Sequence, residues 1–277
     1  MFEEEILPEN CRQTREMIWR MYRDAADHDY LLARFSARSN LLYQFWWNAQ
    51  QAIEKYLKAA LLLNGKPTVT YRHGLKKMLE EAQGFSGDLL PMVLCPPKDV
   101  RSKNRLNPRG FLPIKEFVEK VERNGDANNR YRISSVSTER RDLLYFDETC
   151  FHLRRISFPL DMKLDDKNST AREELLANRN IQLHPEMGFD NFFERTHKEA
   201  WDEYFRWCNF AYFYEETVAR GEYPSWGGSI NAEPFLAHKS GKETELNSLS
   251  WVAENSFPKN LQKIVSKKIG EKRRKPR

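Results

Sequence analysis

The sequence predicts an all-α fold, and two observations lead to that prediction. Successive segments place apolar side chains three and four residues apart, which is the spacing of one face of an α-helix. Alternation of apolar and polar residues, which a half-buried strand would show, never persists beyond three or four positions. With 277 residues, of which 40% are hydrophobic, the chain has ample material for a packed core.

The stretch Asn40–Gly65 (NLLYQFWWNAQQAIEKYLKAALLLNG) is the element around which we expect the chain to fold. Its apolar positions form one continuous stripe along about seven turns of helix. Its alanines let neighbouring helices approach closely, while large side chains such as Trp46 supply apolar area. Asn40 can cap the start, and Asn64-Gly65 is a typical stop. We therefore expect a central helix rather than a surface helix.

Other segments with helical periodicity lie on both sides of this stretch. They are Cys11–Arg23, Ala26–Arg38, Gly74–Gln83, Ile114–Asn124 and Asp142–Ile156. The composition of Gly84–Pro113 is typical of a surface loop, and Asn128–Ser135 is interpreted as an irregular turn.

The elements suggest three parts. Residues 1–160 form a helical bundle, and residues 161–220 a helical extension with a short helix at Thr170–Ala177, capped by Ser169, and a long aromatic-rich helix at Asp190–Ala219. In residues 221–277 Gly, Pro, Ser and Asn dominate, so we expect an irregular segment that ends in a disordered basic tail.

The formal net charge of +5 is unevenly distributed, because the last eleven residues (KKIGEKRRKPR) carry seven basic side chains. Such a tail suits contact with phosphates, and a solvated end is the alternative interpretation.

Metal, membrane and secretion signals are not found in the sequence. No CxxC or Cys-His cluster with zinc spacing is formed by the four cysteines, Cys11, Cys95, Cys150 and Cys208. The longest apolar run, near Ala59–Leu63, is far shorter than the roughly 20 residues of a membrane span. We expect a soluble, cytoplasmic, reduced protein that uses no metal and no cofactor.

Four of the predicted helices resemble those of the HEPN superfamily, whose members are small helical bundles often encoded beside nucleotidyltransferases. The similar segments are ADHDYLLARFSAR, FWWNAQQAIEKYLKAALLLNG, HGLKKMLEEA and LLYFDETCFHLRRI, together with Asn-Arg-Tyr at 129–131. The resemblance covers roughly residues 20–160. It implies a fold that commonly dimerises and that binds nucleotides or nucleic acid, or cleaves RNA without a metal ion.

Active members of the superfamily share an Arg and, four to six residues later, a His, often with a polar residue directly after the Arg. A His of near-neutral pKa can move a proton on or off the RNA 2′-hydroxyl, while the Arg stabilises charge on the phosphate. RNIQLH fits this pattern and makes Arg179, Asn180 and His184 the catalytic candidates. It follows the helix that resembles the last of the bundle, whereas active members carry the pair within that helix.

A second segment, RDAADH, has the same spacing between Arg23 and His28 but lies at or before the first helix. For both segments the alternative is ordinary helix-end chemistry, with a salt-bridged Arg and an exposed or capping His. His73 is interpreted as a helix-entry residue that fixes the turn rather than as catalytic, and His152 as a structural or surface residue. The cluster Phe45–Trp47 is interpreted as core or dimer interface rather than as a base-stacking platform.

Basic side chains in the loop before Ile114 and near the Asn-Arg-Tyr segment are candidates for nucleic-acid contact. They are Lys98, Arg101, Lys103, Arg105, Arg109 and Arg130, and a solvated loop is the alternative interpretation.

The leading hypothesis is a HEPN-type protein acting on RNA or nucleotides, as a metal-independent endoribonuclease of the toxin or defence kind. One alternative is a non-catalytic module that binds a nucleotide or nucleic acid, and another is a helical scaffold for protein partners. The expected partners are RNA or a nucleotide, a second copy of the chain, and a nucleotidyltransferase or antitoxin, with no membrane.

Overall fold

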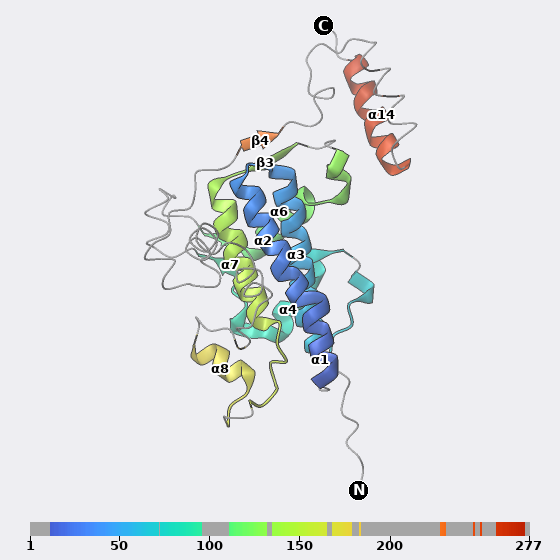
Figure 1. The fold of residues 1–277 in the computed structure, drawn as a ribbon. Helices are drawn as coiled ribbons and strands as arrows, with labels where there is room; N and C mark the ends of the chain where they lie inside the picture. The colour runs from blue at the N-terminus through green and yellow to red at the C-terminus, as the bar shows by residue number, and fades with distance from the viewer. Residues whose placement is uncertain are drawn as a thin grey trace, which may run out of the picture.

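In the computed structural model, helix α3 (Leu42–Leu63) runs through a bundle of helices (Figure 1). The structure describes residues 12–71, 73–95, 111–131, 135–164, 168–178 and 259–274, with 183, 228–230, 246 and 250 between them. Helix α3 packs against α2 (Asp24–Arg38), α4 (Leu75–Ser86) and α7 (Arg140–Ile156). The predicted all-α class is confirmed.

The first helices follow one another without a break. Helix α1 (Arg12–Ile18) continues through the π-helical turn η2 (Trp19–Arg23) into α2. At the junction the N–H of Asp24 donates to the carbonyl of Trp19, a step of five residues that widens the helix locally.

The two ends of α3 differ from each other in how well the sequence predicted them. Asn40 is not the cap: it adopts a left-handed conformation with φ 56°, and Leu41 precedes the first helical residue. A short polar side chain tolerates this conformation, so Asn40 turns the chain instead of capping it. At the other end the predicted stop is confirmed, because Asn64 Nδ2 donates to the Ala60 carbonyl at 2.8 Å and Gly65 has φ 71°.

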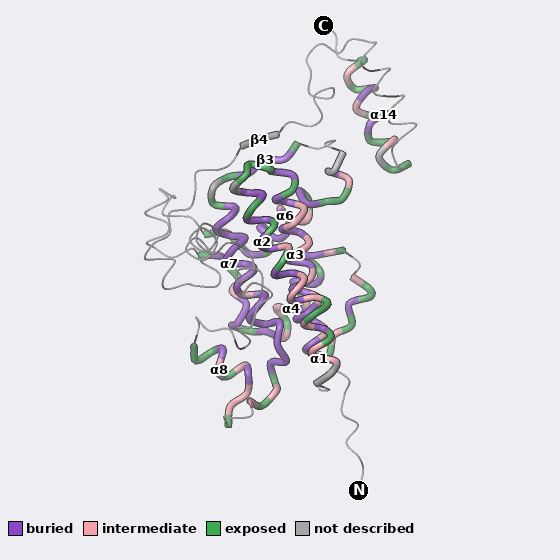
Figure 2. The backbone as a smooth tube through the Cα atoms, viewed as in Figure 1, coloured by how far each residue is buried: buried purple, intermediate pink, exposed green. Residues whose placement is uncertain are grey.

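Most of α3 is buried, but one stripe stays accessible (Figure 2). Its exposed or half-buried members recur at helical spacing and are Gln44, Trp47, Asn48, Gln51, Lys55, Lys58 and Leu62. The expectation of a central rather than a surface helix was therefore only partly right, since α3 is both the centre of the core and part of the surface.

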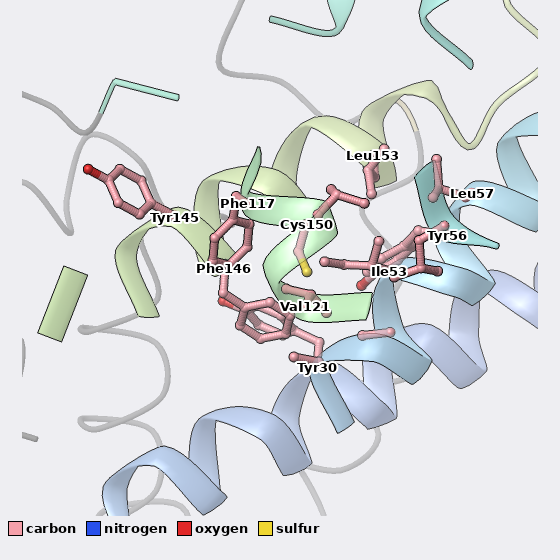
Figure 3. Packing of buried hydrophobic residues seen from close by; sticks show 14 of the residues in the cluster. Tyr30, Ile53, Tyr56, Leu57, Phe117, Val121, Tyr145, Phe146, Cys150 and Leu153 are labelled. Carbon is pink, nitrogen blue, oxygen red and sulfur yellow. The ribbon is translucent and has the colours of Figure 1, made fainter. Parts of the chain in front are cut away.

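The core lies between α2, α3, α7 and α6 (Ile114–Asn124). Figure 3 shows Phe146 and Cys150 of α7 facing the side chains of α3, among them Ile53, with Tyr30 of α2 beside them. The rings of Tyr30 and Phe146 stack with centroids 5.3 Å apart. The alanines of α3 permit this packing, and Ala52 has no exposed surface.

Two buried ion pairs connect α2 with α7. Arg154 donates to both oxygens of Asp27, through Nε at 2.9 Å and Nη2 at 3.1 Å. Asp147 accepts from the guanidinium of Arg34, and the hydroxyl of Tyr30 donates to it at 2.6 Å. Each buried carboxylate thus has an arginine and a further donor, which offsets the cost of removing it from water.

Short elements connect the helices. They are η3 (Val69–Tyr71), η4 (Gly87–Leu89), β1 (Val93–Leu94), β2 (Leu112–Pro113), η5 (Ala127–Tyr131), β3 (Val136–Thr138) and β4 (Gly228–Ile230). Strand β1 pairs antiparallel with β2, and β3 with β4. Helix α6 ends at Asn124 as predicted, whereas the predicted irregular turn after it begins with a 3₁₀ turn.

The C-terminal part departs from prediction at two places. Helix α8 (Ala171–Ala177) is capped by Thr170, whose side chain accepts from the N–H of Glu173, and not by Ser169. Helix α14 (Lys259–Arg274) forms where a disordered tail was expected. Its apolar residues repeat at helical spacing, and Val265 and Ile269, one turn apart, are buried. The predicted helix Asp190–Ala219 lies outside the described residues.

Candidate functional site

A pocket of about 260 Å³ lies where the first turns of α3 meet the end of α6. Its lining comes from both helices and from the turn η5, and consists of Tyr43, Gln44, Trp47, Asn124, Gly125, Asp126 and Asn129. The volume is near the lower end of the ~300–1,000 Å³ that small-molecule sites usually have, so one planar ring system would fill much of it.

Gly125 allows α6 to end directly against α3. A Cβ at this position would lie 2.5 Å from the carbonyl oxygen of Trp46 and 2.6 Å from Cβ of Gln50. Both distances are far below van der Waals contact, so a residue with a side chain would force the two helices apart. The close approach of α6 to α3 beside the pocket therefore requires glycine at position 125.

Two side chains fix the turn that follows α6. Asn129 Nδ2 donates to the carbonyls of Arg123 at 3.0 Å and Asn124 at 2.9 Å, satisfying two acceptors at the helix end. Asp126 Oδ1 accepts from the N–H of Asn128 at 2.7 Å. The polar rim of the pocket is thus held by local hydrogen bonds.

The lining combines flat apolar surface with hydrogen-bonding groups. Tyr43 is nearly buried and Trp47 half-buried, while Gln44 is exposed. Amide side chains carry both donors and acceptors, and the carboxylate of Asp126 accepts only. An aromatic face beside such groups can stack on a base and hydrogen-bond to its edge.

The predicted catalytic residues Arg179, Asn180 and His184 lie outside the described residues. The same holds for the predicted phosphate contacts Lys98, Arg101, Lys103, Arg105 and Arg109. Arg130 belongs to η5, next in sequence to Asn129 of the pocket, but its side chain is not among those described.

The second Arg-His segment does not present the pair to a common surface. Arg23 is buried and donates from Nε and Nη2 to Asp24, whereas His28 on α2 is exposed. Burial lowers the pKa of Arg23, followed by the effect of nearby Arg154. RDAADH therefore provides no exposed guanidinium beside His28.

Two titratable groups on α7 lie outside the lining of the pocket, Glu148 buried and His152 half-buried. Burial lowers the pKa of His152 to about 3, with a further contribution from Arg155. Burial also raises the pKa of Glu148 to about 7, although the N–H of Cys95 donates to its Oε1 at 2.9 Å. A half-buried imidazole with a lowered pKa agrees with the structural or surface role expected of His152.

Sequence reasoning missed most of the pocket. The sequence places Asn124 only at the end of a predicted helix, and Trp47 in the core or a dimer interface. The one signal that could have drawn attention to Trp47 is its place on α3: it shares a stripe with polar residues such as Gln44 and Gln51.

Across the described residues, no three or more His, Cys, Asp or Glu side chains are grouped to hold a metal ion. Nor does any helix in the described part of the chain have the length and apolar character to cross a membrane.

Comparison with known proteins gives a family match for part of the helical core. The family model of the HEPN domain matches residues 19–107, which include α2, α3 and α4 and therefore the α3 side of the pocket. Neither the curated proteins nor the solved structures gave a match. The resemblance inferred from the sequence is confirmed by the family match over residues 19–107, which are similar to the HEPN domain, an all-α domain of a family whose functions relate to nucleotides and RNA.

Proposed function

We propose that this protein binds RNA or a nucleotide, with one base in the pocket at the start of α3. The observation that carries the proposal is the lining itself, in which Trp47 and Tyr43 stand beside Asn124, Asp126 and Asn129. Stacking favours any base, and the amide and carboxylate groups can select among base edges.

The matched HEPN family supports this choice of ligand, because its functions relate to nucleotides and RNA. The position of nearby basic residues also supports a nucleotide or RNA ligand. Arg130 follows Asn129 directly in the chain, so a cation is close in sequence to the pocket rim, and the loop with Lys98 to Arg109 is proposed to supply further phosphate contacts.

Binding of a fluorescein-labelled single-stranded RNA and of mononucleotides tests the proposal. Trp47→Ala should weaken binding by roughly 5- to 150-fold, because stacking on one base contributes about 1–3 kcal/mol. Trp47→Phe keeps a ring and should retain most of the affinity. Phe111→Ala, which removes an exposed aromatic side chain near the opposite end of α6, is the matched control. Unchanged binding by Trp47→Ala would overturn the proposal.

Metal-independent RNA cleavage by Arg179, Asn180 and His184 remains a second proposal, of the toxin or defence kind. It is supported by the spacing of the RNIQLH segment. Incubation of total RNA in the presence of a chelator, with wild type and His184→Ala, distinguishes it from binding alone. Equal cleavage by both proteins would remove the support for His184.

A homodimer forms part of the proposal, since it would place two copies of the site in one assembly. Exposed apolar side chains on α1, η2 and α2 support it, namely Met17, Met21, Leu32 and Phe35. Light scattering of a monomer at micromolar concentration would contradict it. A nucleotidyltransferase or antitoxin partner, which the family suggests, is a further proposal. A scaffold role through the aromatic second part of the chain and a cytoplasmic location are proposals that rest on the sequence.

A further inference from the structure

The rim of the pocket at the start of α3 offers more hydrogen-bond acceptors than donors to a ligand. Asn129 shows this most clearly, because its Nδ2 already donates to the carbonyls of Arg123 at 3.0 Å and Asn124 at 2.9 Å. An amide nitrogen has two hydrogens, so both donors of this side chain are used. Only the side-chain oxygen of Asn129 is left for a molecule in the pocket that this residue lines.

Asp126 supplies a second acceptor on the same rim. Its Oδ1 accepts from the N–H of Asn128 at 2.7 Å, and this bond fixes the direction of the exposed side chain. The two oxygens of a carboxylate together have about four lone-pair positions, so one hydrogen bond leaves most of the accepting capacity for a ligand. The carboxylate of Asp126 is therefore both held in place and available.

A third acceptor lies against the glycine that lines the pocket. Gln50 is 7% exposed, and its Oε1 has no hydrogen-bond donor among the described residues. A Cβ on Gly125 would lie 2.8 Å from this oxygen, so Oε1 is next to the pocket wall. A buried amide oxygen without a donor adds partial negative charge there, which favours a ligand that brings donors.

The charge of the lining favours a base over a phosphate as the occupant. Among the described residues that line the pocket, Asp126 is the only charged one, so a phosphate placed there would be repelled. Tyr43 and Trp47 provide flat surface for a ring. The amides of Gln44 and Asn124 can supply N–H donors beside the acceptors described above.

The four RNA bases differ in the donors on their Watson–Crick edges. Guanine carries two adjacent donors, N1–H and the N2 amino group, next to the acceptor O6. Adenine and cytosine each carry an amino donor next to a ring nitrogen that accepts, and uracil carries N3–H between two carbonyls. A carboxylate can accept from both donors of guanine at once, in the parallel arrangement in which it also binds the fork of an arginine.

We propose that the pocket selects guanine, and that Asp126 determines this selectivity by accepting from N1–H and N2–H of the base. The inference rests on the proposed function and names the base that this function binds. An amide donor of Gln44 or Asn124 pairs with O6, and the oxygen of Asn129 adds to the acceptors of the rim. Adenine or cytosine would set a ring-nitrogen lone pair against the carboxylate, which costs affinity.

Short fluorescein-labelled RNAs test the choice of base with the full chain. Each RNA consists of uridines with one central nucleotide, which is guanosine, inosine, adenosine or cytidine. Inosine is the sharpest probe, because its base lacks the N2 amino group of guanine and keeps N1–H and O6. The guanosine RNA should bind roughly 10- to 150-fold more tightly than the inosine RNA, the range for one hydrogen bond to a charged group.

Asp126→Asn removes the charge and keeps the turn, because asparagine has nearly the same size and can still accept from the N–H of Asn128. It should reduce the preference for guanosine over inosine to below about threefold. Trp47→Ala should weaken binding of both RNAs by the same factor and keep the preference. Asp88→Asn removes an exposed carboxylate of η4, outside the pocket lining, and is the matched control.

Thermal denaturation of each variant shows whether the fold is kept. Should Asp126→Asn be unstable, Asp126→Ser is the second variant, since a serine hydroxyl can also accept from the N–H two residues later.

Competition by unlabelled GMP and GTP distinguishes the two sources of guanine. Displacement of the labelled RNA by GMP or GTP more readily than by IMP supports a free guanine nucleotide as the ligand. Displacement by the guanosine RNA alone supports a guanosine within RNA. Either result agrees with selection of guanine by the pocket.

Two results for wild type overturn the inference and leave the proposed function intact: equal binding of the guanosine and inosine RNAs, or tighter binding of the adenosine or cytidine RNA. A preference for guanosine that persists in Asp126→Asn and Asp126→Ser also overturns it, because the selectivity would then come from other residues. Absence of binding of every RNA and nucleotide by wild type overturns the proposed function instead, and with it this inference.

Discussion

Asp27 and Glu54 are both nearly buried carboxylates of the helical core, yet their partners differ sharply in exposure. Asp27 is paired with Arg154, whose side chain is 1% exposed, whereas Glu54 is paired with His73, whose side chain is 79% exposed. The first pair is enclosed and connects two helices. In the second pair, a buried carboxylate contacts an imidazole that solvent and ligands can reach.

Pairs of an acidic and a basic side chain therefore contribute differently to stability in this fold, depending on how exposed they are. An enclosed pair contributes to the native state because removing either partner leaves a buried charge without compensation. An open pair contributes little to stability, since water can replace the lost partner. Stability measurements can therefore separate the two regions.

The largest loss is expected from Arg154→Ala. It leaves Asp27 buried with only the hydroxyl of Tyr56 as a side-chain donor from α3, and should lower the free energy of unfolding by about 3–5 kcal/mol. Urea denaturation measures the change. A loss below about 1 kcal/mol would mean that the enclosed pair contributes no more to stability than a surface pair does.

Ala52→Asp should cost several kcal/mol on the order of a buried, unpaired charge, because Ala52 has no exposed surface. Gln51→Asp, at the half-buried neighbouring position, is the matched control and should stay within about 1 kcal/mol of wild type. Equal melting temperatures for wild type and Ala52→Asp would show that α3 is not packed as described.

Glu148 and His152 should give opposite pH dependences. The pKa of Glu148 is raised to about 7, so its contribution to stability is present below its ordinary pKa of 4.5 and is lost as the pH rises through 7. The pKa of His152 is lowered to about 3, so its contribution is present above its ordinary pKa of 6.5 and is lost as the pH falls towards 3.

Glu148→Gln should therefore stabilise the protein above pH 7, by up to roughly 3 kcal/mol, and have little benefit near pH 4. Unfolding by urea at a series of pH values measures this. A constant difference between variant and wild type across the series would contradict the raised pKa of Glu148.

The smallest change in stability is expected for His73→Ala. Its ring is largely exposed, and Glu54 keeps Lys58 as a partner, so the loss should be within about 1 kcal/mol. Differential scanning calorimetry beside Arg154→Ala gives the direct contrast. A loss as large as that of Arg154→Ala would mean that the pair of His73 with Glu54 stabilises the fold as the enclosed pair does.

The sequence predicted the helices better than the site. The centre of α3 and both ends of α6 could be predicted because periodic apolar residues and an Asn-Gly stop are local signals. The pocket could not, since it forms only when the end of α6 reaches α3, and nothing local shows that Gly125 meets the backbone of Trp46. Likewise His73 was noticed, but its partner Glu54 sits among charged residues of a helix and has no distinguishing local pattern.

The basic end illustrates a different limit. Its charge suggested disorder, yet Val265 and Ile269 provide an apolar stripe on which α14 forms. The composition of this segment shows its high charge but not the helical spacing of its apolar residues.

We propose that a base occupies the pocket beside Trp47. The indole N–H signal of Trp47 tests this proposal directly. In ¹H–¹⁵N spectra the signal is assigned by its loss in Trp47→Phe, and the protein is then titrated with single-stranded RNA or a mononucleotide. The account predicts that this signal shifts progressively to saturation, with the same Kd as labelled RNA. An indole signal of Trp47 that stays in place while the protein is saturated with RNA would contradict it.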